Sequence, residues 1–284
     1  MAEIDLRPAG SQELRAIAAR RRFDDRSFAL AARLAEEGGA WVVLDQGESI
    51  GMSLLHATAE EHYVGDLYVE PSYRGNGVGA TLLDAALESG AGGLARTVLL
   101  DPADAAAAAL VLRRGIAVRT PVLRVSGAVP KDDVLAAMAA SEYRFDVESI
   151  DPSAHAFSLD ALDRETRGAP RGPEHARFAR AATGSALLRG DEFVAYAYAW
   201  PDGRIGPMAA VSAAYLVPAF ALALLVLRRS HAASWCSLLL PATNVRLLRA
   251  ALRCGLRIER SYLLASDAAQ PELSRYAGFD PLLF

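Results

Sequence analysis

Three glycines at alternate positions interrupt the stretch YVEPSYRGNGVGATLLDAAL, which runs from Tyr68 to Leu87. An extended segment precedes them, and leucines at helical spacing follow, so the glycines lie between a predicted strand and a predicted helix. Glycine lets a backbone turn sharply and lets other groups approach it closely. A simple turn needs one such residue, so the series Gly75, Gly77 and Gly79 predicts a ligand against this loop.

The position of the loop indicates which ligand it binds. The first turn of a helix presents N–H groups without partners and the positive end of the helix dipole, and both attract phosphate. Arg74 adds positive charge at the same point, which favours a pyrophosphate. A Walker loop is excluded because no Gly-Lys-Ser/Thr ending is present. The glycine order and the lack of a suitably placed acidic residue also exclude a dinucleotide fold.

The first half of the chain predicts a mixed α/β layer. Hydrophobic periodicity and turn residues predict helices that begin on serine or aspartate caps, and strands that alternate with them. We expect strands over 3–9, 40–45, 49–57, 62–71, 97–102 and 116–127, and helices over 11–22, 24–39, 77–87 and 103–115.

The second half partly repeats the first. Residues 185–200 match the hairpin of residues 40–55, and the interval from Asn244 to Gly255 equals that from Asp104 to Gly115. Repeated order and spacing predict two copies of one fold, with domains at 1–128 and 129–284. The second copy has neither an arginine nor alternating glycines after GRIGPMAA, so we expect only the first to bind the phosphate ligand.

Composition narrows the function classes. A formal charge of −4 argues against a general nucleic-acid binder, and the two cysteines form no metal-ligand cluster. The N-terminus has no apolar signal-peptide core, so we expect a cytoplasmic protein without a membrane or nucleic-acid partner. The uncharged segment Ile205–Leu227 is long enough to span a bilayer, but its glycine and prolines favour a strand, a turn and a buried helix beginning near Pro218.

The segment LYVEPSYRGNGVGA resembles the coenzyme A loop of the GNAT acyltransferase superfamily, and the element order of the first half is similar to that of the family. The resemblance implies two GNAT-like domains, each a mixed, mostly antiparallel central sheet flanked by helices, the second degenerate. It implies acetyl-CoA as co-substrate, no metal, and an amine of a small molecule or peptide as acceptor. The residues it assigns to the acyl donor are Tyr68, Val69, Arg74, Gly75, Asn76, Gly77, Val78, Gly79 and Ala80.

The usual catalytic residues of the family are missing. Many members have an asparagine near the start of the helix after the fifth strand and, seven residues later, a tyrosine that acts as the general acid. These positions are Asp104 and Val111 here. The second half keeps Asn244 but has Ala251, and the frequent glutamate of the central strand falls on Gly65.

Three catalytic candidates remain. Asp66 would act as the general base and Tyr68 as the general acid. Asp104 is a further candidate, although it is also placed to cap the following helix. His56 and His62 fit no metal motif, and the row Tyr196, Tyr198 and Trp200 indicates packing more than a substrate groove.

Three functions follow from these residues. The first is acetyl-CoA-dependent N-acetyl transfer to an amine that the sequence does not identify. The second is coenzyme A binding or sensing without turnover, which the missing Tyr and Glu favour. The third is transfer of another acyl group, as in relatives of mycothiol synthase or of aminoacyl transferases. The sequence indicates neither the acyl chain nor the oligomeric state.

Overall fold

The computed structural model describes residues 4–89, 94–139, 143–267 and 271–284 and divides the chain into two compact units. Unit 1 comprises Met1–Arg119, Leu263–Ala268 and Pro281–Leu283, and unit 2 comprises Thr120–Tyr262, Ala269–Asp280 and Phe284. Each unit therefore contains segments from both halves of the sequence. A single boundary between residues 128 and 129, as expected from the sequence, would not give such units.

Unit 1 is built on a mixed sheet in which neighbouring strands are mostly antiparallel. The hairpin of β2 and β3 turns at Gln46 and Gly47, both with positive φ, as the alternating pattern predicts. β4 pairs antiparallel with β3 and parallel with β5. The strands are β1 (Ile4–Pro8), β2 (Ala40–Asp45), β3 (Glu48–Ala57), β4 (Glu61–Val69) and β5 (Ala95–Leu100), in that order across the sheet.

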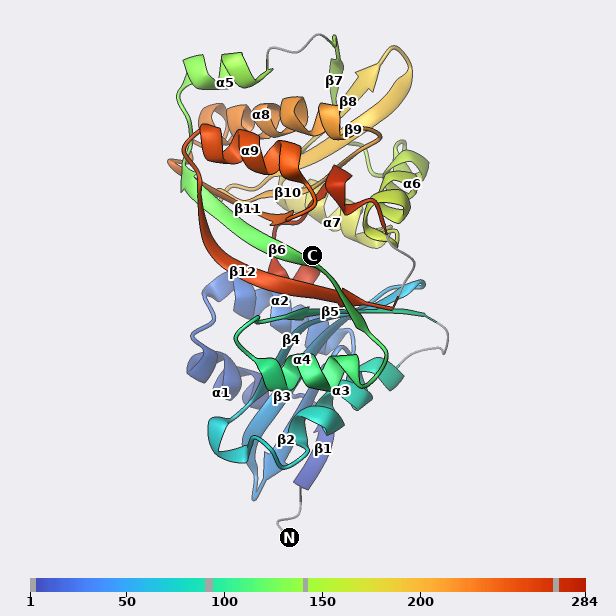
Figure 1. The fold of residues 1–284 in the computed structure, drawn as a ribbon, viewed down its shortest axis with the longest axis vertical. Helices are drawn as coiled ribbons and strands as arrows, with labels where there is room; N and C mark the ends of the chain where they lie inside the picture. The colour runs from blue at the N-terminus through green and yellow to red at the C-terminus, as the bar shows by residue number, and fades with distance from the viewer. Residues whose placement is uncertain (1–3, 90–93, 140–142, 268–270) are drawn as a thin grey trace. The chain divides into compact units, whose positions relative to one another are not determined.

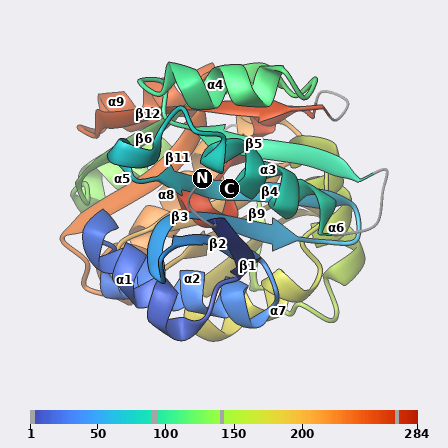
Figure 2. The same cartoon turned by 90° about the horizontal axis from the view of Figure 1, so that it is seen from below.

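Helices cover both faces of this sheet, with α1 and α2 on one face and α3 and α4 on the other (Figure 2). The first face buries Leu14, Ile17 and Leu34 against Met52 and Leu54, and the second buries Leu83 and Val111 against Val64 and Val98. The helices are α1 (Ser11–Arg21), α2 (Asp25–Glu36), α3 (Val78–Glu88) and α4 (Ala105–Leu112), with a 3₁₀ turn η1 (Pro71–Tyr73) before α3.

Unit 2 contains a second, antiparallel sheet in the order β13-β10-β9-β8-β7, with helix α8 packed against its strands. The strands are β7 (Asp146–Ser149), β8 (Thr183–Arg189), β9 (Glu192–Ala199), β10 (Ile205–Ala210), β11 (Trp235–Pro241) and β13 (Tyr276–Ala277). The helices are α5 (Asp132–Ala139), α6 (Ala156–Arg167), α7 (Pro173–Ala181), α8 (Ala213–Arg229) and α9 (Val245–Arg253), with the 3₁₀ turn η2 (Leu273–Arg275) near the end. The last 3₁₀ turn, η3 (Pro281–Leu283), belongs to unit 1.

Two long strands, β6 (Ala117–Ala128) and β12 (Arg257–Ser266), connect the units along the chain (Figure 1). In unit 1, Leu263–Ser266 of β12 pairs antiparallel with β5. In unit 2, residues 122–128 of β6 pair antiparallel with β11. Each half of the sequence thus supplies one strand segment to the unit built mainly from the other half.

The internal repeat is visible in matching local structure. Asp104 caps α4 by accepting a hydrogen bond from the Ala107 amide at 2.9 Å, and Asn244 caps α9 through the Leu247 amide at 3.3 Å. Gly115 and Gly255 follow these helices with φ of 78° and 100°. The equal spacing in the sequence therefore corresponds to equal structural positions, and the expected class, mixed and mostly antiparallel sheets flanked by helices, is confirmed.

Two local expectations were wrong. α8 begins at Ala213, after the Ser212 cap, and includes Pro218 inside the helix, where the ring leaves one backbone hydrogen bond unmade. Gly10, not Ser11, is the N-cap of α1, and it provides no side-chain cap. The strand and buried helix expected over Ile205–Leu227 are present as β10 and α8. Within the described parts of the chain, no helix combines the length and apolar character needed to cross a bilayer.

Candidate acyl-donor site

The glycine loop adopts the left-handed backbone that its sequence predicts. Gly75 and Gly77 have φ of 83° and 87°, a region that other residues enter only with strain. A Cβ added to either glycine would meet no atom within 4 Å, so open space lies beside the loop. Gly79 is different: its added Cβ would make ordinary contact with Val69 at 3.5 Å. Two of the three glycines are therefore required by conformation.

The N-terminus of α3 meets the requirements of an anion site. Gly77 is its N-cap and supplies no side-chain hydrogen bond to the first turn. Val78 is buried with Leu82 under β2 and β3, which fixes the helix start against the sheet. Asn76 and Arg74 are exposed, Gly79 and Ala80 are half-buried, and the Arg74 Nε donates to the Val69 carbonyl at 3.2 Å. Backbone amides and one guanidinium therefore lie together, as binding of a pyrophosphate requires.

A gap opens beside the loop because β4 and β5 pair over only part of their length. Their parallel pairing ends at Val64 and Val98, although β4 continues to Val69. The register of β4 against β3 shifts at this point, so that Gly65 forms a bulge. Among the residues that the structure describes, no strand pairs with Asp66–Val69 on the β5 side. The backbone there can bond an extended ligand, which is the role expected for Tyr68 and Val69.

The turn η3 explains why position 65, where the resemblance implies a glutamate, is a glycine. A Cβ at Gly65 would lie 2.7 Å from the Leu282 Cα and 2.8 Å from the Pro281 carbonyl oxygen. Tyr63 donates a hydrogen bond from its hydroxyl to the same carbonyl. The turn η3 therefore occupies the space that a side chain at position 65 would need.

Asp66, Tyr68 and Glu70 lie at alternate positions and face α1. The Arg21 Nη2 donates to Asp66 at 2.7 Å, and its guanidinium lies 4.9 Å from the centre of the Tyr68 ring. The Arg20 Nη1 donates to Glu70 at 2.5 Å. Sequence reasoning missed Arg20, Arg21 and Glu70; the arginine run at the end of α1 was the available signal.

The three side chains of this row, Asp66, Tyr68 and Glu70, differ in how their surroundings affect their charge. Burial, and then the hydrogen bond to Glu70, raise the pKa of Tyr68, so its phenol keeps a proton at neutral pH. The hydrogen bond from Arg20 lowers the pKa of Glu70. Arg21 offsets the charge of the Asp66 carboxylate. Tyr68 is thus a proton donor in this row, and both carboxylates are held by arginines.

The other candidates have structural positions. Asp104 caps α4, so the capping interpretation accounts for it, and Asp101 accepts a hydrogen bond from the Ala103 amide in the preceding turn. Val111, at the usual tyrosine position, is fully buried in the core of unit 1. His56 and His62 are buried on β3 and β4, and His62 Nδ1 bonds the Leu87 carbonyl at 3.1 Å. No cluster able to hold a metal occurs among the described residues.

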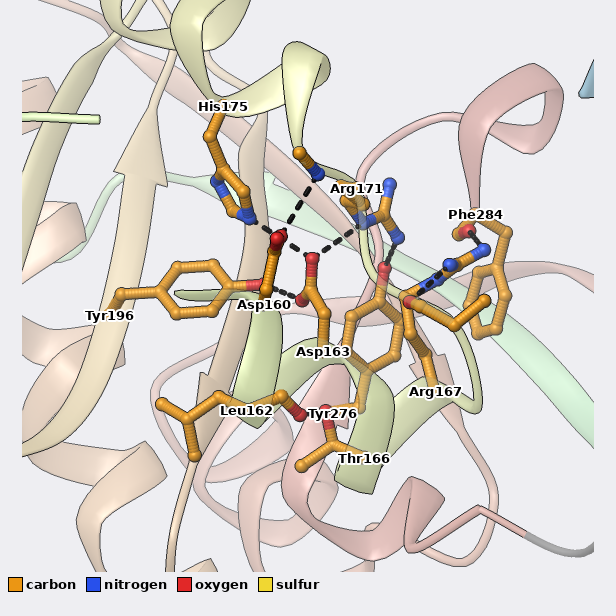
Figure 3. Close-up of polar contacts among 12 residues, drawn as sticks. Asp160, Leu162, Asp163, Thr166, Arg167, Arg171, His175, Tyr196, Tyr276 and Phe284 are labelled. Carbon is orange, nitrogen blue, oxygen red and sulfur yellow. Dashed lines mark hydrogen bonds and ion pairs between the residues drawn. The ribbon is translucent and has the colours of Figure 1, made fainter. Parts of the chain in front are cut away.

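The aromatic row Tyr196, Tyr198 and Trp200 is buried in unit 2, as expected for packing, and Tyr196 contacts the buried carboxylate of Asp163 (Figure 3). Tyr196 donates to Asp163, and His175 Nε2 donates to the same carboxylate at 3.0 Å. Burial acts to raise the pKa of Asp163, but His175 and Arg171 outweigh it, so the pKa lies below its usual value. Asp163 has no exposed surface, so this network stabilises unit 2 rather than reaching a substrate.

Residues 6–116 match the family model of the acetyltransferase (GNAT) family. No curated protein matches the sequence. Among solved structures, a Pyrococcus horikoshii protein assigned as an acetyltransferase has a TM-score of 0.72 at 16% identity, over 97% of this chain and 94% of that one. A tandem GNAT protein from the clavulanic acid biosynthesis pathway has a TM-score of 0.60 at 17% identity, over 95% and 99%.

A third structure, a GCN5-related N-acetyltransferase from Sphaerobacter thermophilus, has a TM-score of 0.61 at 15% identity, over 94% and 96% of the two chains. At these identities the likeness concerns the fold. Residues 6–116 therefore form a domain that matches the acetyltransferase (GNAT) family, and the chain as a whole has the fold of tandem GNAT proteins.

Proposed function

We propose that the protein is an N-acetyltransferase that uses acetyl-CoA bound to unit 1. The observation that carries the proposal is the joint presence of a left-handed glycine loop, a helix start without a side-chain cap, and the gap between β4 and β5. Amides from Arg74 to Ala80 would hold the pyrophosphate, and the free edge of β4 at Tyr68 and Val69 would hold the pantetheine arm.

An amine acceptor must lose a proton to attack, because amines are mostly protonated at neutral pH. We assign this role to Asp66, directly or through a water molecule, since it is the carboxylate on β4 next to the gap. Arg21 then holds Asp66 in place, and an ammonium group would compete with the guanidinium for the carboxylate. Tyr68, whose raised pKa keeps the phenol protonated, is the candidate donor to the leaving thiolate, with solvent as the alternative.

A binding or sensing protein without turnover is the second candidate. Two observations favour it: Val111 is buried where relatives have their acid, and η3 fills the space where they have a glutamate. Transfer of an acyl group other than acetyl is the third candidate function, because the pyrophosphate loop does not discriminate acetyl from longer acyl groups. We further propose that the acceptor is an amine of a small molecule or peptide, and that the protein acts in the cytoplasm without a membrane or nucleic-acid partner.

The deciding experiment is a panel of amines, including amino sugars, polyamines, amino acids and peptides with free N-termini, incubated with acetyl-CoA and a thiol reagent. Amine-dependent thiol release above the rate without amine supports the transferase. Tight binding of coenzyme A with no release for any amine supports the binding protein. Failure to bind coenzyme A contradicts both.

A further inference from the structure

The strands of unit 2 that correspond to β4 and β5 also separate, but the gap between them is filled. β10 and β11 correspond by their order in the repeat, and a single bridge between Arg204 and Ser237 joins their starts. Beyond it, β13 pairs antiparallel with β10, Met208 opposite Ala277 and Ala209 opposite Tyr276. Gly278 exchanges two backbone hydrogen bonds of 2.9 Å with Leu239 of β11. The segment Tyr276–Gly278 therefore bonds both walls of the gap.

A side chain at the start of α9 also binds this segment. Asn244 is 1% exposed, and its Nδ2 donates to the Tyr276 carbonyl at 3.0 Å while its Oδ1 caps the helix. Asp104, at the same position of the repeat, also caps its helix but carries no amide donor. The two copies therefore differ at this position, and in unit 2 the residue that occupies it contacts the inserted backbone.

The side chains of the segment are held as well. Arg171 donates to the Tyr276 hydroxyl inside the Asp163 network, and Tyr276 is fully buried (Figure 3). The Arg167 Nη2 donates to the Phe284 carbonyl at 3.3 Å, and the Phe284 ring packs edge-on against Tyr276 with centroids 5.3 Å apart. A Cβ at Gly278 would lie 2.6 Å from the Phe284 ring, so glycine is needed for this packing.

The loop before α8 lacks the features of a phosphate site. The Ser212 hydroxyl caps α8 by accepting a hydrogen bond from the Ala214 amide at 3.3 Å. Arg275, which precedes the inserted segment, donates to the Val211 carbonyl at 2.6 Å and pairs with Glu165. The helix start is therefore capped, and the nearby arginine is already bonded to protein groups.

We infer that the gap between β10 and β11 is a peptide-binding site whose ligand is the chain's own segment Tyr276–Gly278. The segment adds to β10 and β11 by strand pairing, Asn244 fixes its backbone, and a buried polar pocket receives the Tyr276 side chain. Unit 2 is thereby closed to an acyl donor, which leaves one donor site in each chain. This last consequence rests on the proposed function of unit 1.

Hydrogen exchange of the whole protein, read by mass spectrometry over residues 271–284, tests the inference. The amides of this segment should exchange at least about a hundredfold more slowly than in an unstructured peptide, since exchange then requires opening of the pairing. Saturating coenzyme A should leave their rates unchanged. Rates near those of a free peptide, or faster exchange upon addition of coenzyme A, would overturn the inference.

Matched variants identify the contacts. Asn244→Asp keeps the helix cap but replaces the amide donor with a carboxylate oxygen, so exchange over residues 271–284 should accelerate at least about tenfold. Tyr276→Phe, which removes only the hydroxyl bonded by Arg171, should also accelerate it. Asp104→Asn, the reverse change at the corresponding position of unit 1, should leave these rates unaltered. Equal effects of Asn244→Asp and Asp104→Asn would contradict the proposed contact.

Titration with coenzyme A separates the two proposals. One site per chain in the wild-type protein agrees with both. Two equivalent sites would overturn the closure of unit 2. No binding, together with a protected segment, would refute the proposed function and leave the peptide site standing.

Discussion

Replacing Gly77 with alanine tests the acyl-donor site with little disturbance to the fold. Gly77 has φ of 87°, and the added methyl group would meet no protein atom within 4 Å. The loss of folding free energy is therefore conformational. A left-handed alanine costs about 1–2 kcal/mol in the folded protein, and this is offset by roughly 0.4–1 kcal/mol because alanine restricts the unfolded chain. A net loss near 1 kcal/mol lowers Tm by about 2–4 °C in a protein of this size class.

The effect on binding should be larger than the effect on folding. The methyl group and the altered backbone would act where the amides of α3 meet the pyrophosphate, and a lost hydrogen bond to a charged group costs about 1.5–3 kcal/mol. Because 1.4 kcal/mol is a factor of about ten in affinity, we expect the Kd for coenzyme A to rise at least about tenfold. Isothermal titration calorimetry measures the Kd, and thermal unfolding measures the fold.

Gly47→Ala is the matched control. Gly47 lies in the turn between β2 and β3 with φ of 84°, and its added Cβ also meets no atom within 4 Å. The two variants should therefore lose similar stability, but only Gly77→Ala should lose affinity. Unchanged affinity in Gly77→Ala, or equal losses in both variants, would refute the phosphate-binding interpretation of the loop.

Three further predictions concern other groups. Asp66→Asn should reduce turnover by about a hundredfold or more, the usual scale for a general base, with little change in coenzyme A affinity; unchanged turnover with an identified acceptor would remove Asp66 from the mechanism. Asp163→Asn should destabilise unit 2 by about 3–5 kcal/mol in denaturant unfolding at neutral pH, because it leaves buried cationic partners unpaired. The pKa of Asp163 in the folded protein lies below its ordinary value of 3.8. The difference in unfolding free energy between wild type and Asp163→Asn should therefore be complete above pH 3.8 and shrink as the pH falls through the lower, folded-state pKa. A difference that does not change on acidification would contradict a charged Asp163 in the folded protein. Gly278→Ala should destabilise by about 1–3 kcal/mol through overpacking against Phe284, and combining it with Phe284→Ala should cost less than the sum of the two changes; additive costs would show that the two residues do not interact.

Features that depend on local sequence were largely predictable. Gly75 and Gly77 indicated positive φ, Asp104 indicated a helix cap, and equal spacing to Gly115 and Gly255 indicated the repeat. Each of these signals acts within a few residues, through backbone conformation or hydrogen bonds of a single turn. The start of α8 was missed because Pro218 indicated a helix start, whereas the cap that begins the helix is Ser212 and the proline lies inside it.

Features that depend on distant contacts were not predictable. Nothing near Gly65 in the sequence indicates that Pro281 and Leu282 would occupy the space of its side chain. The pairing of Arg21 with Asp66 likewise joins residues 45 positions apart. Residues 276–278 form too short a segment for period-two alternation to indicate a strand, and their pairing partners lie far away in the sequence.

The exchange of strand segments between the two halves constrains how the protein folds during synthesis. The edge of β5 in unit 1 is paired by Leu263–Ser266, which the ribosome adds more than 160 residues after β5 itself. Until then β5 presents unpaired backbone and an apolar surface, the condition under which nascent chains associate wrongly. Closing the sheet across such a separation is also slow, because a long loop must be ordered first. A gene fragment ending at residue 128 would therefore be expected to yield aggregated polypeptide, whereas co-expression with the remainder could restore the missing segment in trans.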